Sequence, residues 1–182
     1  MLNTISGMLG GGAAPLFDFD SIATVAGNGS ATTLSFTGIP SGYTHLQVRY
    51  SFLINGGGVN LPDMRINNDA TSNYADHRLT GNGATVSAGA RTGNQELPIN
   101  AQSPGGDTTY PTAGVIDILD YSNTNKYKTV RTLLGCDKNG SGGIDLRSGL
   151  WMSTSAITQL NFITQSGYEF KSGSIFALYG IK

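Results

Sequence analysis

The fold is decided by one stretch of the chain, Val115-Ile-Asp-Ile-Leu-Asp-Tyr121, then Ser-Asn-Thr-Asn, then Lys126-Tyr-Lys-Thr-Val-Arg-Thr-Leu-Leu134. Both runs are rich in β-branched and apolar residues, which favour strands. The four small polar residues 122–125 between them have the length and composition of a hairpin loop. Because Val115–Leu119 is apolar on both faces, we expect this strand to lie at the centre of a sheet and to be covered on both sides.

Charged residues in this hairpin have a structural interpretation. We expect Asp117 and Asp120 to lie at a strand end or beside a neighbouring lysine. Lys126, Lys128 and Arg131 form a small basic patch on the second arm. We interpret this patch as a solvated face, or as the partner of the two aspartates across the hairpin, because opposite charges on paired strands attract.

The rest of the chain reads as short strands separated by glycine-rich turns. In Thr44–Leu53 apolar residues alternate with polar ones, which is typical of a half-exposed antiparallel strand. Gly81-Asn-Gly83 predicts a second hairpin, and Ser174–Ile181 predicts a last strand paired within the sheet. Roughly ten strands at this spacing predict an all-β fold, a single jelly-roll-like antiparallel β-sandwich that spans residues 21–182.

The first 20 residues differ from the β-rich remainder. An apolar face of helical spacing is formed by Leu2, Ile5, Met8 and Leu9, and Gly10–Gly12 would end the helix. A helix of two turns is marginal on its own and needs a partner for its apolar face. We therefore predict that residues 1–20 form a short N-terminal anchoring arm or helix that docks on a partner subunit.

Composition excludes several classes of partner. Charged residues make up 13% of the chain and the net charge is −1, so no basic stripe for nucleic acid is expected. No basic residue precedes Arg49, so the positive region of a secretory signal is missing, and no run approaches the ~20 apolar residues of a membrane span. We expect a soluble protein without membrane insertion that is assembled in the cytoplasm.

No catalytic motif stands out. The chain has two histidines, His45 and His77, and neither a Gly-x-Ser-x-Gly nor a His-Glu-x-x-His pattern. Asp137-Lys-Asn-Gly-Ser-Gly142 resembles the start of a calcium loop, but Ser148 stands where a bidentate glutamate is required. We expect no enzyme activity, no metal site and no cofactor.

Aromatic residues leave glycan binding open, because jelly rolls often bind sugars through exposed rings and polar loops. The sequence alone does not separate core rings from exposed ones. The candidates are Tyr43, Tyr50, Tyr74, Tyr110, Tyr121, Tyr127, Trp151 and Tyr168.

Several segments resemble a family of tailed-bacteriophage virion proteins. The likeness follows the chain in order over about residues 21–182, through Thr44-His-Leu-Gln-Val-Arg49, Asn67-Asn-Asp69, Ser72-Asn-Tyr-Ala75, His77-Arg-Leu79, Gly81-Asn-Gly83, Val115–Tyr121, Asn125–Arg131, Ser148-Gly-Leu-Trp151, Ala156-Ile-Thr158 and Phe176-Ala-Leu-Tyr-Gly-Ile181. The family is uncharacterised and is grouped with tail-fibre-like and decoration-like proteins. The resemblance implies a place in a virion, and it brings no catalytic residue with it.

The leading hypothesis from the sequence is therefore a non-enzymatic structural protein on the virion surface, most simply in the tail fibre or baseplate, where it contacts the host. The partners expected are other virion proteins, further copies of the chain (with a trimer as the commonest fibre symmetry) and a host-surface glycan. One alternative is a capsid decoration protein, and another, from a different class, is a free carbohydrate-binding module.

Overall fold

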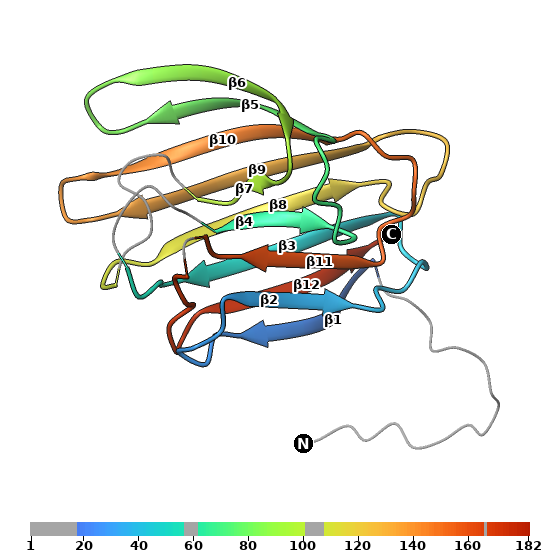
Figure 1. Cartoon of the computed structure of the whole chain (residues 1–182), viewed down its shortest axis with the longest axis horizontal. Helices are drawn as coiled ribbons and strands as arrows, with labels where there is room; N and C mark the ends of the chain where they lie inside the picture. The colour runs from blue at the N-terminus through green and yellow to red at the C-terminus, as the bar shows by residue number, and fades with distance from the viewer. Residues whose placement is uncertain (1–17, 57–61, 101–107, 166) are drawn as a thin grey trace.

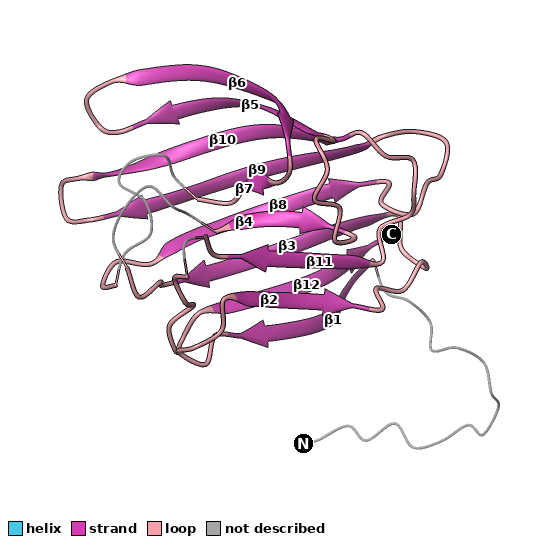
Figure 2. Ribbon diagram, viewed as in Figure 1, coloured by secondary structure: helices cyan, strands magenta, loops and turns pink. Residues whose placement is uncertain are grey.

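The computed structural model describes residues 18–56, 62–100, 108–165 and 167–182. These residues form twelve strands and no helix (Figure 2). The strands are β1 (Phe19–Ala26), β2 (Thr33–Thr37), β3 (His45–Phe52), β4 (Asp63–Ile66), β5 (Tyr74–Gly81), β6 (Val86–Asn94), β7 (Leu97–Pro98), β8 (Thr112–Leu119), β9 (Lys128–Asp137), β10 (Gly142–Trp151), β11 (Gln159–Ile163) and β12 (Ile175–Ile181).

Two antiparallel sheets pack as a sandwich, as the sequence predicted. The larger sheet has eight strands in the order β1-β12-β3-β8-β9-β10-β5-β6, and the smaller has four in the order β2-β11-β4-β7. In Figure 1 the smaller sheet lies over the part of the larger one from β1 to β9, and β5 and β6 extend past it. Because the smaller sheet has only four strands, it leaves the larger sheet uncovered at β5 and β6.

The central hairpin is confirmed, with one correction. β8 pairs with β9 in register from Ala113–Gly135 to Leu119–Thr129, and β8 lies between β3 and β9 inside the larger sheet. The expectation that both faces of this strand are covered is wrong. Ile116 and Ile118 are fully buried, whereas Leu119 is exposed and Val115 only half-buried, because no described segment packs on the other face.

The core lies between the sheets and is built on aromatic rings. Phe162 of β11 stacks on Phe176 of β12 with ring centroids 4.4 Å apart, so this pair joins the two sheets. Tyr50 of β3 stacks on the same Phe176 at 5.3 Å, and Phe170 meets it edge-on at 5.5 Å. Such pairs add about 0.5–1.5 kcal/mol each beyond the apolar area they bury.

The last strand is held on both sides. β12 pairs with β1 from Phe19–Ile181 to Ala26–Ile175, and its other edge pairs with β3. The predicted terminal strand is therefore confirmed as an interior strand of the larger sheet. Among the described residues, no helix is long and apolar enough to cross a membrane.

Candidate functional site

The face of the larger sheet that points away from the smaller sheet, here called the outer face, carries an unusual set of exposed apolar side chains. Side chains alternate between the two faces along each strand, so the buried residues of β10 mark the inner face and their neighbours the outer one. Leu79, Leu133, Leu146 and Ile144 each expose between 50% and 56% of their surface. The described residues place nothing over them.

Strand register brings these side chains into a continuous row, here called the leucine row. Leu146 lies directly opposite Leu79 on one side and Leu133 on the other. Leu133 is in turn opposite Val115, and Leu79 is opposite Ala88. The row thus crosses five neighbouring strands, from β6 to β8, with no polar side chain in it. Contiguous apolar patches of this kind mark contact surfaces on soluble proteins.

A second row, two residues along each strand, alternates large and small side chains and is here called the glycine row. Ile144 lies between Gly81 of β5 and Gly135 of β9. Beyond these glycines lie Val86 on β6 and Ala113 on β8. A branched side chain therefore stands between two positions without any side chain, so the row has a knob flanked by hollows.

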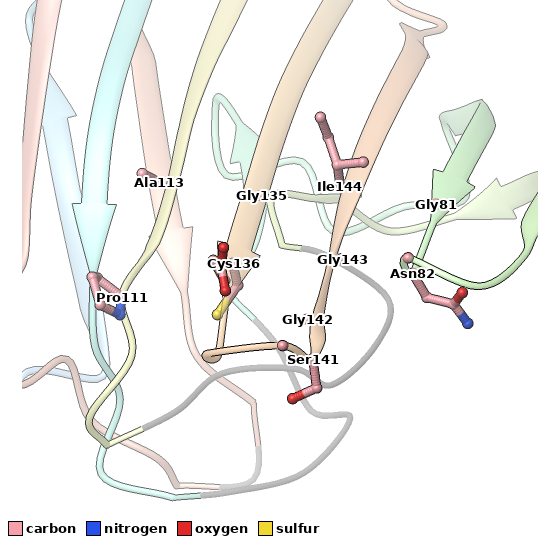
Figure 3. A pocket seen from close by; sticks show the side chains of 13 residues that line it. Gly81, Asn82, Pro111, Ala113, Gly135, Cys136, Ser141, Gly142, Gly143 and Ile144 are labelled. Atoms are coloured by element: carbon pink, nitrogen blue, oxygen red, sulfur yellow. The ribbon is translucent and has the colours of Figure 1, made fainter.

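The hollows open into a groove at the end of the sheet. Its volume is about 780 Å³, and Figure 3 shows Ile144 above the turn that Gly142 and Ser141 form, with Ala113 and Pro111 on one side and Asn82 on the other. Glycines make up much of its lining, so backbone amides and carbonyls form its walls. The groove extends the glycine row toward the loops rather than forming an enclosed pocket.

On the other side of the leucine row lies a polar row. Ser148 of β10 is opposite His77 on one side and Arg131 on the other. Arg131 is opposite Asp117 of β8, whose carboxylate accepts a hydrogen bond of 2.8 Å from the amide of Gln47. His77 and Arg131 are exposed and Asp117 is half-buried, so the polar row places a guanidinium and a carboxylate at the edge of the apolar surface.

A cluster of charged side chains lies on the inner face where the smaller sheet ends. Arg91 Nε donates to Asp76 Oδ1 at 2.7 Å, and Arg147 Nη1 donates to Asp76 Oδ2 at 3.3 Å. Arg147 Nη2 also donates to Asp145. The side chains of Asp76, Asp145 and Arg147 are at most 3% exposed. Each buried carboxylate faces a guanidinium, so the cluster joins β5, β6 and β10 through paired charges.

One buried carboxylate is a separate case. Asp63 at the start of β4 accepts a hydrogen bond from Gln165, and the two line a small cavity of about 140 Å³ together with Glu96. Burial, followed by the nearby negative charge of Glu96, raises the pKa of Asp63 to about 7. This group titrates near neutrality, but it has no histidine or hydroxyl nucleophile among its cavity neighbours.

The histidines do not form a site together. His45 Nδ1 accepts a hydrogen bond of 3.0 Å from the backbone N–H of Asp120, at the end of the central hairpin. His77 lies on the outer face of β5, and β8, β9 and β10 separate that strand from β3. Asp76 points to the opposite face from His77, so these two cannot act as a pair. Across the described ranges, no three His, Cys, Asp or Glu side chains gather in a way that could hold a metal ion.

The calcium-like segment is a tight hairpin turn between β9 and β10. The Asp137 carboxylate accepts a hydrogen bond of 3.0 Å from the N–H of Asn139, and Lys138 N–H donates to the carbonyl of Ser141 at 2.8 Å. Asn139 has a φ of 53°, in the left-handed region that asparagine tolerates. These hydrogen bonds show that the residues of the calcium-like motif stabilise the turn between β9 and β10.

The basic patch of the sequence is only partly a surface. Lys126 pairs with Asp120, as predicted for a lysine beside these aspartates. The expectation that Lys128 is solvated is wrong, because its side chain is buried and its ammonium donates to the carbonyls of Asn123, Lys126 and Thr154. The ammonium therefore closes the loop of the central hairpin.

Half of the eight candidate sugar-binding rings belong to the core, whereas Tyr110 and Tyr127 are exposed. Tyr50, Tyr74, Tyr121 and Trp151 are buried. An exposed ring pair lies at the far end of the outer face, where Phe19 stacks on Tyr179 at 4.8 Å and the Arg49 guanidinium lies over both rings at 5.3 and 5.6 Å. The guanidinium occupies the space above these rings that a sugar would need.

The predicted anchoring residues Leu2, Ile5, Met8 and Leu9 lie outside the described residues. The outer-face surface was not predicted. The signal for it was present in the consecutive apolar pairs of the central hairpin, Val115-Ile116 and Leu133-Leu134, because one member of each pair must point away from the core.

Comparison of the chain with protein-family models, curated proteins and solved structures found no match. The site is therefore defined by its geometry: an exposed apolar and glycine-lined face on an eight-stranded sheet.

Proposed function

We propose that this protein is a non-enzymatic structural component on the surface of a bacteriophage particle, in the tail fibre or baseplate periphery, where it takes part in host contact. The observation that carries the proposal is the outer face, which presents apolar side chains on a rigid sheet and so has the character of an assembly surface. The resemblance of residues 21–182 to tailed-phage virion proteins supports the same role.

The chemistry of the described residues fits a scaffold. Its buried carboxylates face guanidinium groups in the charged cluster, and its histidines lie apart on different strands. Polar side chains instead organise turns, as Asp137 does, or close loops, as Lys128 does. A scaffold of this kind acts through its surfaces, and the outer face is where exposed leucine and isoleucine side chains gather.

Localisation on intact particles tests the proposal. Gold-labelled antibody raised against the purified protein would be applied to phage particles that carry this sequence and viewed by electron microscopy, with pre-immune antibody as the control. Label at the distal tail is the expected result and would justify a glycan screen. Label over the head would instead assign the protein to capsid decoration. Particles without label, when western blotting detects the protein in infected cells, would contradict both virion roles and leave a free binding module.

A further inference from the structure

We propose that the outer face is a two-fold interface between two copies of this chain, with the symmetry axis parallel to the strands between β9 and β10. The inference is independent of the virion role, since it concerns the purified protein. It rests on the three rows of the outer face and on how they match when one copy is turned over onto another.

The match follows from strand order. A two-fold axis between β9 and β10 lays β10 of one copy over β9 of the other, and β5 over β8. Sheets packed face to face lie about 10 Å apart with strands within about 30° of each other. Rotation about an axis parallel to the strands keeps each residue at its position along the strand direction, so each row of one copy faces the same row of the other near the axis. The leucine row then packs on itself, with Leu146 against Leu133 of the partner subunit and Leu79 against Val115 of the partner subunit.

The glycine row is the most specific part of the match. The same axis places Ile144 over Gly135 of the partner subunit, and Gly81 over Ala113 of the partner subunit. The knob of each copy thus enters a hollow of the other, twice in a symmetric dimer. A flat aliphatic face would stack on any apolar surface, whereas this alternation fits the position that the axis defines.

The polar row supplies complementary charge. His77 comes to lie over Asp117 of the partner subunit, so that an imidazole N–H meets a carboxylate, and Ser148 lies over Arg131 of the partner subunit. No pair of like charges is brought together at this row. Charge complementarity of this type fixes register more than it adds affinity.

The area is sufficient for a modest affinity. About this axis β5, β10, β9 and β8 form a four-strand footprint that, at about 4.8 Å between strands and about six residues along each, covers roughly 400 Å² in flat projection. β6 of each copy adds to this area where it lies over β3 of the partner subunit. The accessible area of a corrugated surface exceeds its projection, so the face approaches the ~600 Å² per partner of the smaller stable interfaces. We expect a dissociation constant on the order of 10 μM, because such small interfaces bind weakly.

Sedimentation velocity on the full chain from about 1 to 200 μM tests the inference. The expected result is a reversible, concentration-dependent rise from the 19.0 kDa monomer toward twice that mass. Ile144→Lys places an ammonium opposite the hollow and should raise the dissociation constant by about 30-fold or more. Ile175→Lys is the matched control, since Ile175 is also exposed on the outer face but lies on β12, beyond the proposed contact.

An exchange of the polar pair tests the position of the axis. His77→Asp and Asp117→His should each weaken the dimer about fivefold, and the double variant should return to within about twofold of the original, because it restores the pair in reversed order. Circular dichroism and thermal melts confirm that each variant is folded.

Three results would overturn the inference. A trimer would do so, because a face that packs on itself closes with two copies. A mass that rises without a plateau would indicate non-specific stacking. A monomer at every concentration would exclude a second copy as the occupant of the outer face. If deletion of residues 1–14 then increased the binding of a fluorescent dye that reports exposed apolar surface, the outer face would be assigned to the N-terminal arm instead.

Discussion

Gly114 shows how tightly the core of the central hairpin is packed. A Cβ at this position would lie 2.4 Å from the Tyr50 hydroxyl and 2.8 Å from Leu134 Cβ. The hydroxyl cannot simply move, because it donates a 2.7 Å hydrogen bond to the carbonyl of Ile99. The residue is therefore small because two neighbouring strands and a loop meet above it.

We expect Gly114→Ala to lower the free energy of unfolding by about 1–3 kcal/mol, the usual cost of overpacking a core. Urea denaturation at low micromolar concentration measures it. Gly81→Ala is the control, because the new Cβ there would meet only Ile144 Cγ2 at an ordinary 3.5 Å. Equal stability of the two variants would show that the core at Tyr50 can relax.

The buried carboxyl of Asp63 makes stability depend on pH. Burial and the neighbouring Glu96 raise its pKa from the ordinary 3.8 to about 7 in the folded protein. Between these values the folded chain holds a proton that the unfolded chain has released, so the contribution of this group is complete below pH 4 and is lost as the pH rises through 7. A tenfold change in proton affinity corresponds to 1.4 kcal/mol, so the loss amounts to at most ~4 kcal/mol.

Asp63→Asn should flatten the dependence of the unfolding free energy on pH between 4 and 7 and should raise stability at pH 8. Denaturant titrations at several pH values check this, with the exposed Asp137→Asn as the control. An unchanged slope in Asp63→Asn would mean that the Asp63 carboxylate is solvated.

At the scale of elements, the charged cluster holds the part of the larger sheet that the smaller one leaves uncovered. Arg147 is its centre, because it donates to both Asp76 and Asp145. Within the described residues, Asp145 Oδ1 has no hydrogen-bond donor of its own, so Asp145 depends on this one guanidinium. Removal of a single partner from a buried ion pair leaves an uncompensated charge.

We expect Arg147→Met to lower the free energy of unfolding by about 3–5 kcal/mol, the cost of breaking a buried pair. Thermal and chemical denaturation measure the loss. The exposed Arg131→Met on the neighbouring strand serves as the control and should change stability by less than about 1 kcal/mol. A small effect of Arg147→Met would indicate that water enters the cluster and solvates both aspartates.

The strands of this fold and the pairings within its two predicted hairpins could be predicted, whereas the pairings between strands far apart in the chain could not. Period-two alternation located β3, and the apolar runs around residues 122–125 located β8 and β9, because both signals are local. Val115 lies on the outer face, so whether it is covered depends on whether another layer packs against that face, which is a matter of how distant segments are arranged. The division into eight and four strands therefore had no local signal.

Polar residues were misassigned for a related reason. Lys128 was expected at the surface, but three backbone carbonyls converge on its ammonium from two separate loops. Asn67 serves a similar purpose, since its amide donates to the carbonyl of Ala156 and accepts from the N–H of Thr158, 91 positions away in the chain. Such long-range contacts of side chains with the backbone become visible only once the chain is folded.

At the scale of the whole molecule, the outer face couples association to stability. Binding of a second copy to the folded state alone stabilises that state by mass action. With a dissociation constant of about 10 μM, dimer formation stabilises the folded state by about 1 kcal/mol at ~100 μM protein and hardly at all at ~1 μM. We expect the thermal midpoint to rise by about 2–4 °C across this range, the shift that 1 kcal/mol causes in a chain of this size. Differential scanning fluorimetry across this range measures the shift, and Ile144→Lys should show none. A shift of equal size in that variant would place the contact elsewhere.

The pairing of β12 also sets the order of events on the ribosome. β1 ends at Ala26, and its partner begins only at Ile175, where β12 also takes its place beside β3. At 5–20 residues per second, roughly 8–30 s separate the synthesis of the two strands. Once β3 has been made, the nascent chain carries two strands, β1 and β3, that await the same partner, and unpaired strand edges are prone to aggregation. β1, at one edge of the larger sheet, is therefore the first of the described strands to be made and must wait for β12, the last of them.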